Sequence, residues 1–253
     1  MFKNDTDLLD QHFLKDREVI NNFINLCNIK NNEEVVEIGP GTGTLTKELC
    51  PKAKKVIAIE LDTNLKPYLD KLVIKYSNLE IIYGNSLEEY IPKCDKIVTA
   101  LPYSIIEPFI NKLLKCEFKE LYMIMGLNYI NNLESNNKLS LLTKSFFNIE
   151  KLGEIPPDAF EPKPRVMSGI VKLTPKELDI NDKYYIIREL FFYRDKKIKN
   201  SLKEILIKKY NITQKESISK IEELNINEEL LNKKFEVLSN KELEELLDNI
   251  KEL

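Results

Sequence analysis

The chain has 253 residues, of which 43% are hydrophobic and 31% charged, enough to bury one large core with a small second unit beside it. Its 38 Lys and Arg against 41 Asp and Glu give a formal net charge of −3, so nucleic acid could be met only by a local basic patch. One histidine and four scattered cysteines exclude a disulfide framework and a Cys/His zinc site, and we expect no metal. No apolar run approaches the roughly 18 residues of a membrane span. We therefore expect a cytoplasmic protein that does not contact a membrane.

Between about residues 17 and 175, short apolar runs alternate with helical patterns, which predicts a mostly parallel sheet covered by helices on both faces. The strands are expected at Glu34–Ile38, Lys55–Glu60, Leu79–Tyr83, Lys96–Ala100 and Leu121–Met125. The helices are expected at Arg17–Cys27, Thr44–Leu49, Asn64–Tyr76, Glu107–Leu114 and around Leu139–Ser145.

Two further β-rich stretches, Asn148–Glu154 and Val166–Leu173, predict an antiparallel pair at one edge of the sheet. The segment 155–165 that joins them holds four prolines, which predicts a stiff surface loop. From about residue 176 the patterns are helical only, through residues 186–206 and then near 216–223, 227–234 and 239–252. We therefore predict an α/β domain over residues 1–175 and a helical domain over 176–253, with the boundary near Thr174–Lys176.

The segment Glu37–Gly43 is glycine-rich and lies where the first predicted strand ends and a helix begins. Gly39, Gly41 and Gly43 allow a tight turn and let a ligand approach the main chain, while a helix N-terminus adds amide donors. The spacing differs from the dinucleotide fingerprint, and no Gly-Lys-Ser/Thr follows as in a phosphate loop. A glycine turn without a ligand is the alternative.

Acidic and amide side chains follow the next two predicted strands. Glu60 ends the second strand, where a carboxylate can accept both hydroxyls of a ribose, with Leu61 beside it. Asn85 and Ser86 follow the third strand, where the adenine edge of the same nucleoside would lie. For Glu60 the alternative is a solvated strand end.

Together these segments resemble the S-adenosylmethionine fold of class I methyltransferases, and further motifs narrow the resemblance. Residues 100–103, Ala-Leu-Pro-Tyr, follow the fourth strand, where adenine- and cytosine-amine methyltransferases carry Asn/Asp-x-Pro-Tyr/Phe. Residues 11–16 resemble the Q-x-F-L-x-D motif of the ribosomal RNA adenine dimethyltransferases. Residues 160–168 resemble that family's F-x-P-x-P-K/R-V-x-S motif, and residues 192–202 its F-x-x-R-x-K segment. The resemblance implies a Rossmann-like, seven-stranded class I methyltransferase sheet with a small C-terminal all-helical domain.

The resemblance also implies a chemistry. The amine of adenine is a poor nucleophile, because its lone pair is delocalised into the ring, and acceptors for its N–H groups favour a pyramidal nitrogen. In the family these acceptors are a backbone carbonyl, here of Leu101, and a side-chain oxygen at the position of Ala100, which alanine lacks. Loss of one such acceptor typically costs on the order of 10²–10³ in rate.

Other residues follow from the same resemblance. Tyr103 is expected to stack on a flipped adenine, with Pro102 stiffening the turn and Phe160 forming the other face of the pocket. Packing under a loop is the alternative for both aromatic rings. Gln11 and Phe13 are expected to close over the methionine end of the cofactor, and Ala100 to lie beside it.

Contact with RNA is expected from basic residues near the proline-rich segment and in the helical part. Residues 188–209 carry eight Lys and Arg against three Asp and Glu, although a solvated helix face is the commoner explanation of such a run. The candidates are Lys163, Arg165, Arg188, Arg194, Lys196, Lys197 and Lys199.

We predict an S-adenosylmethionine-dependent adenine N6-methyltransferase, a monomer acting on ribosomal RNA or a precursor of the small ribosomal subunit. Because Ala100 lacks the acceptor, one alternative is a member that binds cofactor and RNA as a ribosome-assembly factor without methylating. Another is methylation of a different amine by the same pocket.

Overall fold

The computed structural model describes residues 12–101, 105–133, 138–177, 179–181, 184–251 and 253. Of these, the residues within Met1–Asn131 and Asn148–Pro175 form one compact unit, and those within Asn132–Phe147 and Lys176–Leu253 form a second. One division between the two units follows Pro175. The segment 132–147, which we expected in the first domain, is grouped with the second unit because Phe146 packs edge-on against Phe191 and Phe192.

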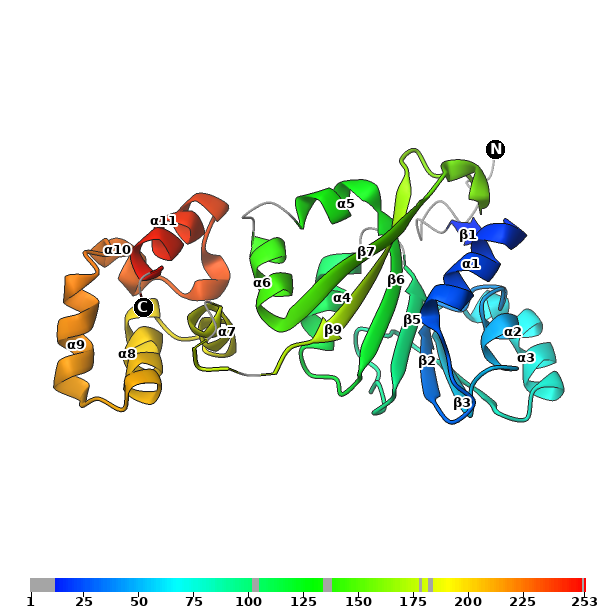
Figure 1. The fold of residues 1–253 in the computed structure, drawn as a ribbon, viewed down its shortest axis with the longest axis horizontal. Coiled ribbons are helices and arrows are strands. Elements are labelled where there is room, and N and C mark those ends of the chain that lie inside the picture. The colour runs from blue at the N-terminus through cyan, green and yellow to red at the C-terminus, as the bar shows by residue number, and fades with distance from the viewer. Residues whose placement is uncertain (1–11, 102–104, 134–137, 178, 182–183, 252) are drawn as a thin grey trace. The chain divides into compact units, whose positions relative to one another are not determined.

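A seven-stranded sheet forms the first unit, in the order β4-β3-β2-β5-β6-β9-β7 (Figure 1). The pairs among β2 to β6 are parallel, whereas β9 runs antiparallel to β6. The inner parallel strands β2, β3, β5 and β6 are short runs that are buried almost throughout, as a sheet covered on both faces requires, whereas the edge strand β4 is mostly half-buried. The strands are β2 (Glu34–Ile38), β3 (Lys55–Glu60), β4 (Leu79–Tyr83), β5 (Lys96–Ala100), β6 (Glu120–Gly126), β7 (Phe147–Ile155) and β9 (Ser168–Pro175).

Helices of this unit connect the strands. Asp16 caps the N-terminus of α1 by accepting from the backbone N–H groups of Glu18 and Val19, and Asn28 ends the helix in a left-handed conformation. One core joins the buried faces of α1 and α3 to alternate residues of the sheet, such as Val35 and Val98. The helices are α1 (Arg17–Cys27), α2 (Thr46–Leu49), α3 (Lys66–Lys75), α4 (Ile106–Leu113) and α5 (Leu127–Asn132).

The proline-rich segment differs from the prediction of a surface loop. It forms a 3₁₀ turn at Pro157–Ala159 and a two-residue strand, β8 (Phe160–Glu161), which pairs antiparallel with β1 (Phe13–Leu14). The carbonyl of Ala159 also accepts from the backbone N–H of Lys15, at 2.9 Å. The segment is drawn inward because Ala159 and Phe160 are buried in the same core as Leu14.

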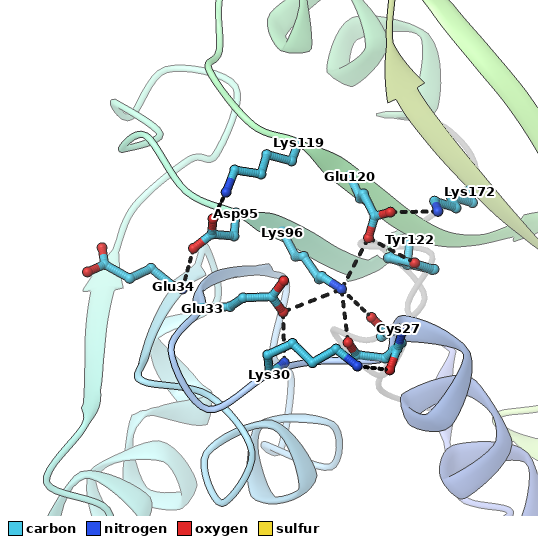
Figure 2. Close-up of polar contacts among 11 residues, drawn as sticks. Cys27, Lys30, Glu33, Glu34, Asp95, Lys96, Lys119, Glu120, Tyr122 and Lys172 are labelled. Atoms are coloured by element: carbon cyan, nitrogen blue, oxygen red, sulfur yellow. Dashed lines mark hydrogen bonds and ion pairs between the residues drawn. The ribbon is translucent and has the colours of Figure 1, made fainter.

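Lys96 organises the edge of the sheet where the parallel strands begin (Figure 2). Its side chain is 6% exposed, and its Nζ donates to the carbonyls of Cys27 at 2.8 Å and Asn28 at 3.1 Å, which end α1. The carboxylates of Glu33, at 3.4 Å, and Glu120, at 3.1 Å, balance its charge. This lysine therefore ties α1 to β5 and β6 at the amino ends of the strands.

The second unit is helical. Thr213 and Ser239 begin α9 and α11 with reciprocal capping boxes, in which Glu216 and Glu242 complete the pairs. The central helix α8 packs against α7, α9 and α10. The helices are α6 (Lys138–Phe146), α7 (Tyr185–Phe192), α8 (Ile198–Tyr210), α9 (Gln214–Glu223), α10 (Glu228–Asn232) and α11 (Asn240–Ile250).

Candidate active site at the carboxyl ends of the parallel strands

The order of the strands indicates where on the sheet a ligand would bind. The chain leaves β2 toward β3 and β4 and then returns to β5 on the other side of β2, so the direction of winding reverses between β2 and β5. Ligands of open α/β sheets bind at the carboxyl ends of the strands at such a reversal. Ile38 of β2 pairs with Thr99 of β5, and the Thr99 hydroxyl donates to the Ile38 carbonyl at 2.9 Å. Gly39 and Ala100 therefore leave the sheet from neighbouring strands.

The three glycines after β2 all have positive φ, +68° at Gly39, +59° at Gly41 and +79° at Gly43. This is the left-handed region that side chains rarely adopt. Space is restricted as well, because a Cβ at Gly43 would lie 2.2 Å from the Leu72 side chain. One at Gly41 would lie 2.9 Å from the Phe13 ring. The loop therefore requires glycine at both of these positions.

Glu60 lies beneath this loop, 4% exposed. Its carboxylate accepts from the backbone N–H of Gly41 at 2.9 Å and of Asp62 at 2.8 Å. A carboxylate has about four acceptor positions, so two are left for hydroxyl groups of a ligand. Burial raises the pKa of Glu60, while the amide donors oppose that effect. The neighbouring Leu61 is 56% exposed, an apolar side chain at the surface beside the carboxylate.

Glu37 is a second carboxyl group under the loop, 1% exposed. Its Oε2 accepts from the Thr46 hydroxyl at 2.6 Å, whereas its Oε1 is buried and has no hydrogen-bond partner within the part of the chain that the structure describes. The pKa of Glu37 is raised to about 8, chiefly by burial. The hydrogen bond from Thr46 lowers this pKa, and the nearby charge of Glu60 raises it. A buried acceptor without a donor is costly, so this oxygen marks a place where a ligand with a donor or a positive charge fits.

Phe13 covers the glycine loop. Strand β1 holds it by pairing with β8, and its ring contacts the side of Gly41 where a Cβ would be. Phe13 is therefore adjacent to the loop, and its closing over a cofactor stays a prediction. Gln11, Pro102 and Tyr103, which we expected in the same site, lie outside the described residues.

The residues after β4 have local partners. The Asn85 side chain accepts from the backbone N–H of Leu87 and donates to the Glu88 carboxylate, both at 3.0 Å, so its amide shapes the turn. Ser86 is 8% exposed. The turn follows the strand next to Glu60, where the prediction places it.

Ala100 ends β5 in register with Ile124 and is partly buried. Leu101 is 5% exposed, and its side chain lies 3.6 Å from the position of a Cβ on Gly39. The first two residues of the 100–103 motif are therefore adjacent to the glycine loop.

Phe160 points into the core instead of a pocket. It is 3% exposed and packs in the same cluster as Leu14 and Ile155. This is the position of the loop anchor that we considered as its alternative role. Sequence patterns missed both β1, which brings Phe13 into place, and Thr46, since a two-residue strand and a single threonine carry no periodic signal.

The basic candidates are distributed over both units and mostly have partners. Lys163 pairs with Asp158 at 2.6 Å, and Arg165 is exposed. Arg194 lies over the Phe191 ring, with 4.7 Å from its Cζ to the ring centroid. Arg188 is 1% exposed and donates to the carbonyls of Glu177 and Asp179, so its assignment to an RNA surface is wrong. The remaining lysines contact polar groups of the second unit: Lys196 with Glu204, Lys197 with Asn232 and Lys199 with Glu228.

A pocket of about 680 Å³ lies at the opposite edge of the sheet, near Cys94 and Cys116. The charged groups of its lining are all in ion pairs, Lys93 with Glu117, Lys119 with Asp95, and Glu34 with Lys54 outside the lining. It therefore offers no uncompensated group to a ligand, and we place the active site at the glycine loop. Among the described residues, no cluster of His, Cys, Asp and Glu is arranged for a metal ion, and no helix has the length and apolarity to cross a membrane.

The chain has relatives of similar sequence. The sequence is 35% identical to the "Probable ribosomal RNA small subunit methyltransferase A" of Methanococcus maripaludis strain C5, with 85% of this chain and 87% of that relative covered. The protein of the same name from Methanococcus aeolicus is 34% identical, with 96% and 95% covered.

Solved structures are similar over the whole chain. A dimethyladenosine transferase from Plasmodium falciparum has a TM-score of 0.65 and 26% identity, with 96% of this chain and 99% of that one covered. The 23S rRNA methyltransferase ErmE has a TM-score of 0.62 and 20% identity, with 94% and 99% covered, a likeness of fold. The predicted class I methyltransferase fold is thus confirmed. The family model described as ribosomal RNA adenine dimethylase matches residues 2–241, and the chain belongs to that family.

Proposed function

We propose that this protein transfers methyl groups from S-adenosylmethionine to the N6 amine of adenine in small-subunit ribosomal RNA. The family and the names of the relatives support this substrate. The observation that carries the proposal is the adjacency of the glycine loop after β2 and residues 100 and 101, which begin the motif after β5; the bond between Thr99 and Ile38 joins the two strands. This adjacency brings a methyl donor and an acceptor base to one crevice.

The residues present fit this cofactor. Glu60 retains acceptor positions for the two ribose hydroxyls, and Leu61 offers an exposed apolar surface beside them. The unpaired Oε1 of Glu37 fits a ligand that carries positive charge. Phe13 covers the loop and excludes water from it. When bound, the cofactor supplies an electrophilic methyl group.

For the acceptor base, the backbone carbonyl of Leu101 accepts a hydrogen bond from the adenine amine, and Tyr103 stacks on the ring. Because Leu101 is buried against the glycine loop, its main chain is held in place. Ala100 contributes no acceptor, so the carbonyl acts without the side-chain oxygen of the family motif. The target adenine is unpaired, since its amine is not accessible within a duplex.

The helical unit supplies RNA contacts through Arg194, Lys196, Lys197 and Lys199, and the proline-rich segment through Lys163 and Arg165. Exposed ion pairs such as that of Lys199 with Glu228 contribute only about 0–1 kcal/mol, so phosphates can displace the carboxylates at little cost.

The direct test is methyl transfer from labelled cofactor to hypomethylated small-subunit RNA and particles. We expect incorporation that mass spectrometry assigns to N6-methylated adenine, and loss of the same mark from cells without the gene. Binding of cofactor and RNA with turnover at background would instead identify a non-catalytic member of the family.

Ala100→Asn tests the pocket. Asparagine restores the acceptor of the family motif, so we expect the rate to rise, by up to the 10²–10³ that such a group typically contributes. Ala100→Leu is the matched control, similar in size but without an acceptor, and should not raise the rate. If neither variant is faster while both bind cofactor normally, the assigned geometry of the pocket is wrong.

A further inference from the structure

Glu37 and Glu60 form a pair of buried carboxyl groups without a compensating cation. Each is at most 4% exposed, and repulsion from Glu60 raises the cost of ionising Glu37. No lysine or arginine of the described chain forms an ion pair with either group. Two buried carboxylates without a counter-charge are strongly disfavoured, so one of them must hold a proton at neutral pH.

The hydrogen bonds indicate which of the two carboxyl groups holds the proton. Glu60 accepts two backbone N–H groups, one on each oxygen, which stabilises its ionised form. Glu37 accepts from Thr46 on Oε2 only, and its Oε1 has no donor among the described groups. The proton therefore resides on Glu37.

The other neighbours of Glu37 leave this assignment unchanged. In the sheet it pairs with Ala58 and Val98, which are apolar. The thiol of Cys50, just after α2, is a titratable group that interacts with Glu37. Burial raises the pKa of this thiol to about 12, so it stays neutral. From β3, Glu60 is the only charged group that acts on it among the described residues.

We propose that Glu37 is protonated in the cofactor-free protein and releases its proton when the positively charged cofactor binds. The inference rests on the proposed use of S-adenosylmethionine. The balance is simple: the carboxylic acid loses a proton to the solvent, and the resulting carboxylate compensates the positive charge of the ligand. No covalent bond of the cofactor changes in this step.

Proton release makes affinity depend on pH with a defined sign. Below a pKa of about 8 the cofactor must displace a proton from Glu37, so affinity rises with pH, by at most about tenfold per pH unit. Above that value the carboxylate is already formed and the rise stops. The α-amino group of the cofactor also titrates with pH, and a terminal α-amino group of a peptide does so near about 7.7–8.0. It does so equally with every variant and cancels in their comparison.

The test is calorimetry of S-adenosylmethionine binding at pH 7 in buffers with different ionisation enthalpies. We expect the wild type to release about one proton more than Glu37→Gln does, because glutamine has none to give. Methylthioadenosine, which is neutral, is the control ligand and should release no proton from either protein. Equal proton counts for the two proteins would overturn the inference and leave the proposed function intact. Failure of the folded wild type to bind the cofactor at all would overturn both.

Two further measurements keep the inference testable if Glu37→Gln binds too weakly for calorimetry. Thr46→Val removes the hydroxyl donor from Oε2, so the pH at which affinity stops rising should move upward; an unchanged midpoint contradicts the inference.

The second measurement is the stability of the cofactor-free protein. Because the pKa of Glu37 is raised in the folded state, its contribution is fully present below about pH 4.5 and lost as pH rises through about 8. The melting temperature of Glu37→Gln should therefore gain on that of wild type between about pH 5 and 8 and then level off, and a constant difference across that range would contradict a protonated Glu37.

Discussion

At Gly43 two independent restrictions meet in one residue. Its φ of +79° disfavours any side chain, and a Cβ would lie 2.2 Å from the Leu72 side chain in α3. The residue thus joins the turn after β2 to the packing of the neighbouring helix. A substitution there should affect the stability of the unit as well as the shape of the cofactor loop.

Gly43→Ala should lower the free energy of unfolding by about 2 kcal/mol, of which about 1–2 come from the left-handed backbone and the rest from displacement of Leu72. Urea titration measures this loss as a lower midpoint with an unchanged slope. Gly153→Ala is the matched control, because a Cβ at Gly153 meets nothing within 4 Å. Its stability should change by less than about 0.5 kcal/mol. Equal stability of the two variants would show that the loop does not require glycine at position 43.

Some residues could be proposed for the site from the sequence, because their positions demand one residue type. Gly39 and Gly41 are examples, since few other residues permit that turn, and so is Glu60, since few other side chains accept that many hydrogen bonds. The unpaired oxygen of Glu37 could not be predicted, since it depends on what α2 and β3 place around it. The inward orientation of Phe160 was also left open, because an aromatic residue in a proline-rich segment fits a pocket and a core equally well.

Among the elements, β5 has different roles at its two ends. Ala100 ends it at the active site, whereas Lys96 begins it at the opposite edge, where it holds the last carbonyls of α1. Favourable charge at a helix C-terminus and four oxygen partners make this lysine a stabilising group far from the chemistry. The two functions can therefore be separated by mutation.

Lys96→Met should lower the free energy of unfolding by about 2–3 kcal/mol, since it removes the cation that Glu33 and Glu120 share, although Glu120 keeps Lys172 as a second partner. The loss is smaller than the 3–5 kcal/mol typical of a fully buried pair, because these carboxylates remain partly in water. Lys119→Met is the control, a 77% exposed partner of Asp95, and should cost less than about 1 kcal/mol. Cofactor affinity should be the same in both. Weaker cofactor binding by Lys96→Met alone would show that the two ends of β5 are coupled.

The strands β2, β3, β4 and β5 begin and end at the predicted residues. For β2, β3 and β5 the reason is that strands buried on both faces appear as compact apolar runs between polar turns, and the half-buried edge strand β4 is a similar short run. The pair β9 and β7 lies at the sheet edge as expected. The pairing of β1 with β8 was not predictable, since two-residue strands show no alternation and their partners are far apart in sequence. The grouping of 132–147 with the helical unit depends on aromatic packing that no local pattern reveals.

For the whole molecule, a formal net charge of −3 means that RNA affinity must come from a few local cations acting against a weakly repulsive background. Such binding is sensitive to salt, because each phosphate contact releases condensed counterions. The number of cations that take part can therefore be counted from the dependence of affinity on salt concentration.

The double variant Arg194→Ala with Lys199→Ala should bind small-subunit RNA more weakly. The slope of log affinity against log salt should fall by about 2, one for each cation removed. The control double variant, Lys54→Ala with Lys93→Ala, also removes two cations, and each of these exposed lysines is in a surface ion pair like that of Lys199. Its slope should match that of wild type, and cofactor affinity should be equal in all three proteins. Equal slopes for the two double variants would remove the helical unit from the RNA surface.

Phe13 pairs with Glu161, and almost all strands of the sheet lie between these two residues in the sequence. The aromatic cover of the glycine loop is encoded near the start of the polypeptide, yet its anchor is translated almost 150 residues later. During synthesis, the strands that form the crevice consequently emerge while Phe13 still lacks its partner strand. The nascent enzyme acquires its cover only when the proline-rich segment has left the ribosome, so assembly of a competent cofactor site is postponed until the first unit is nearly complete.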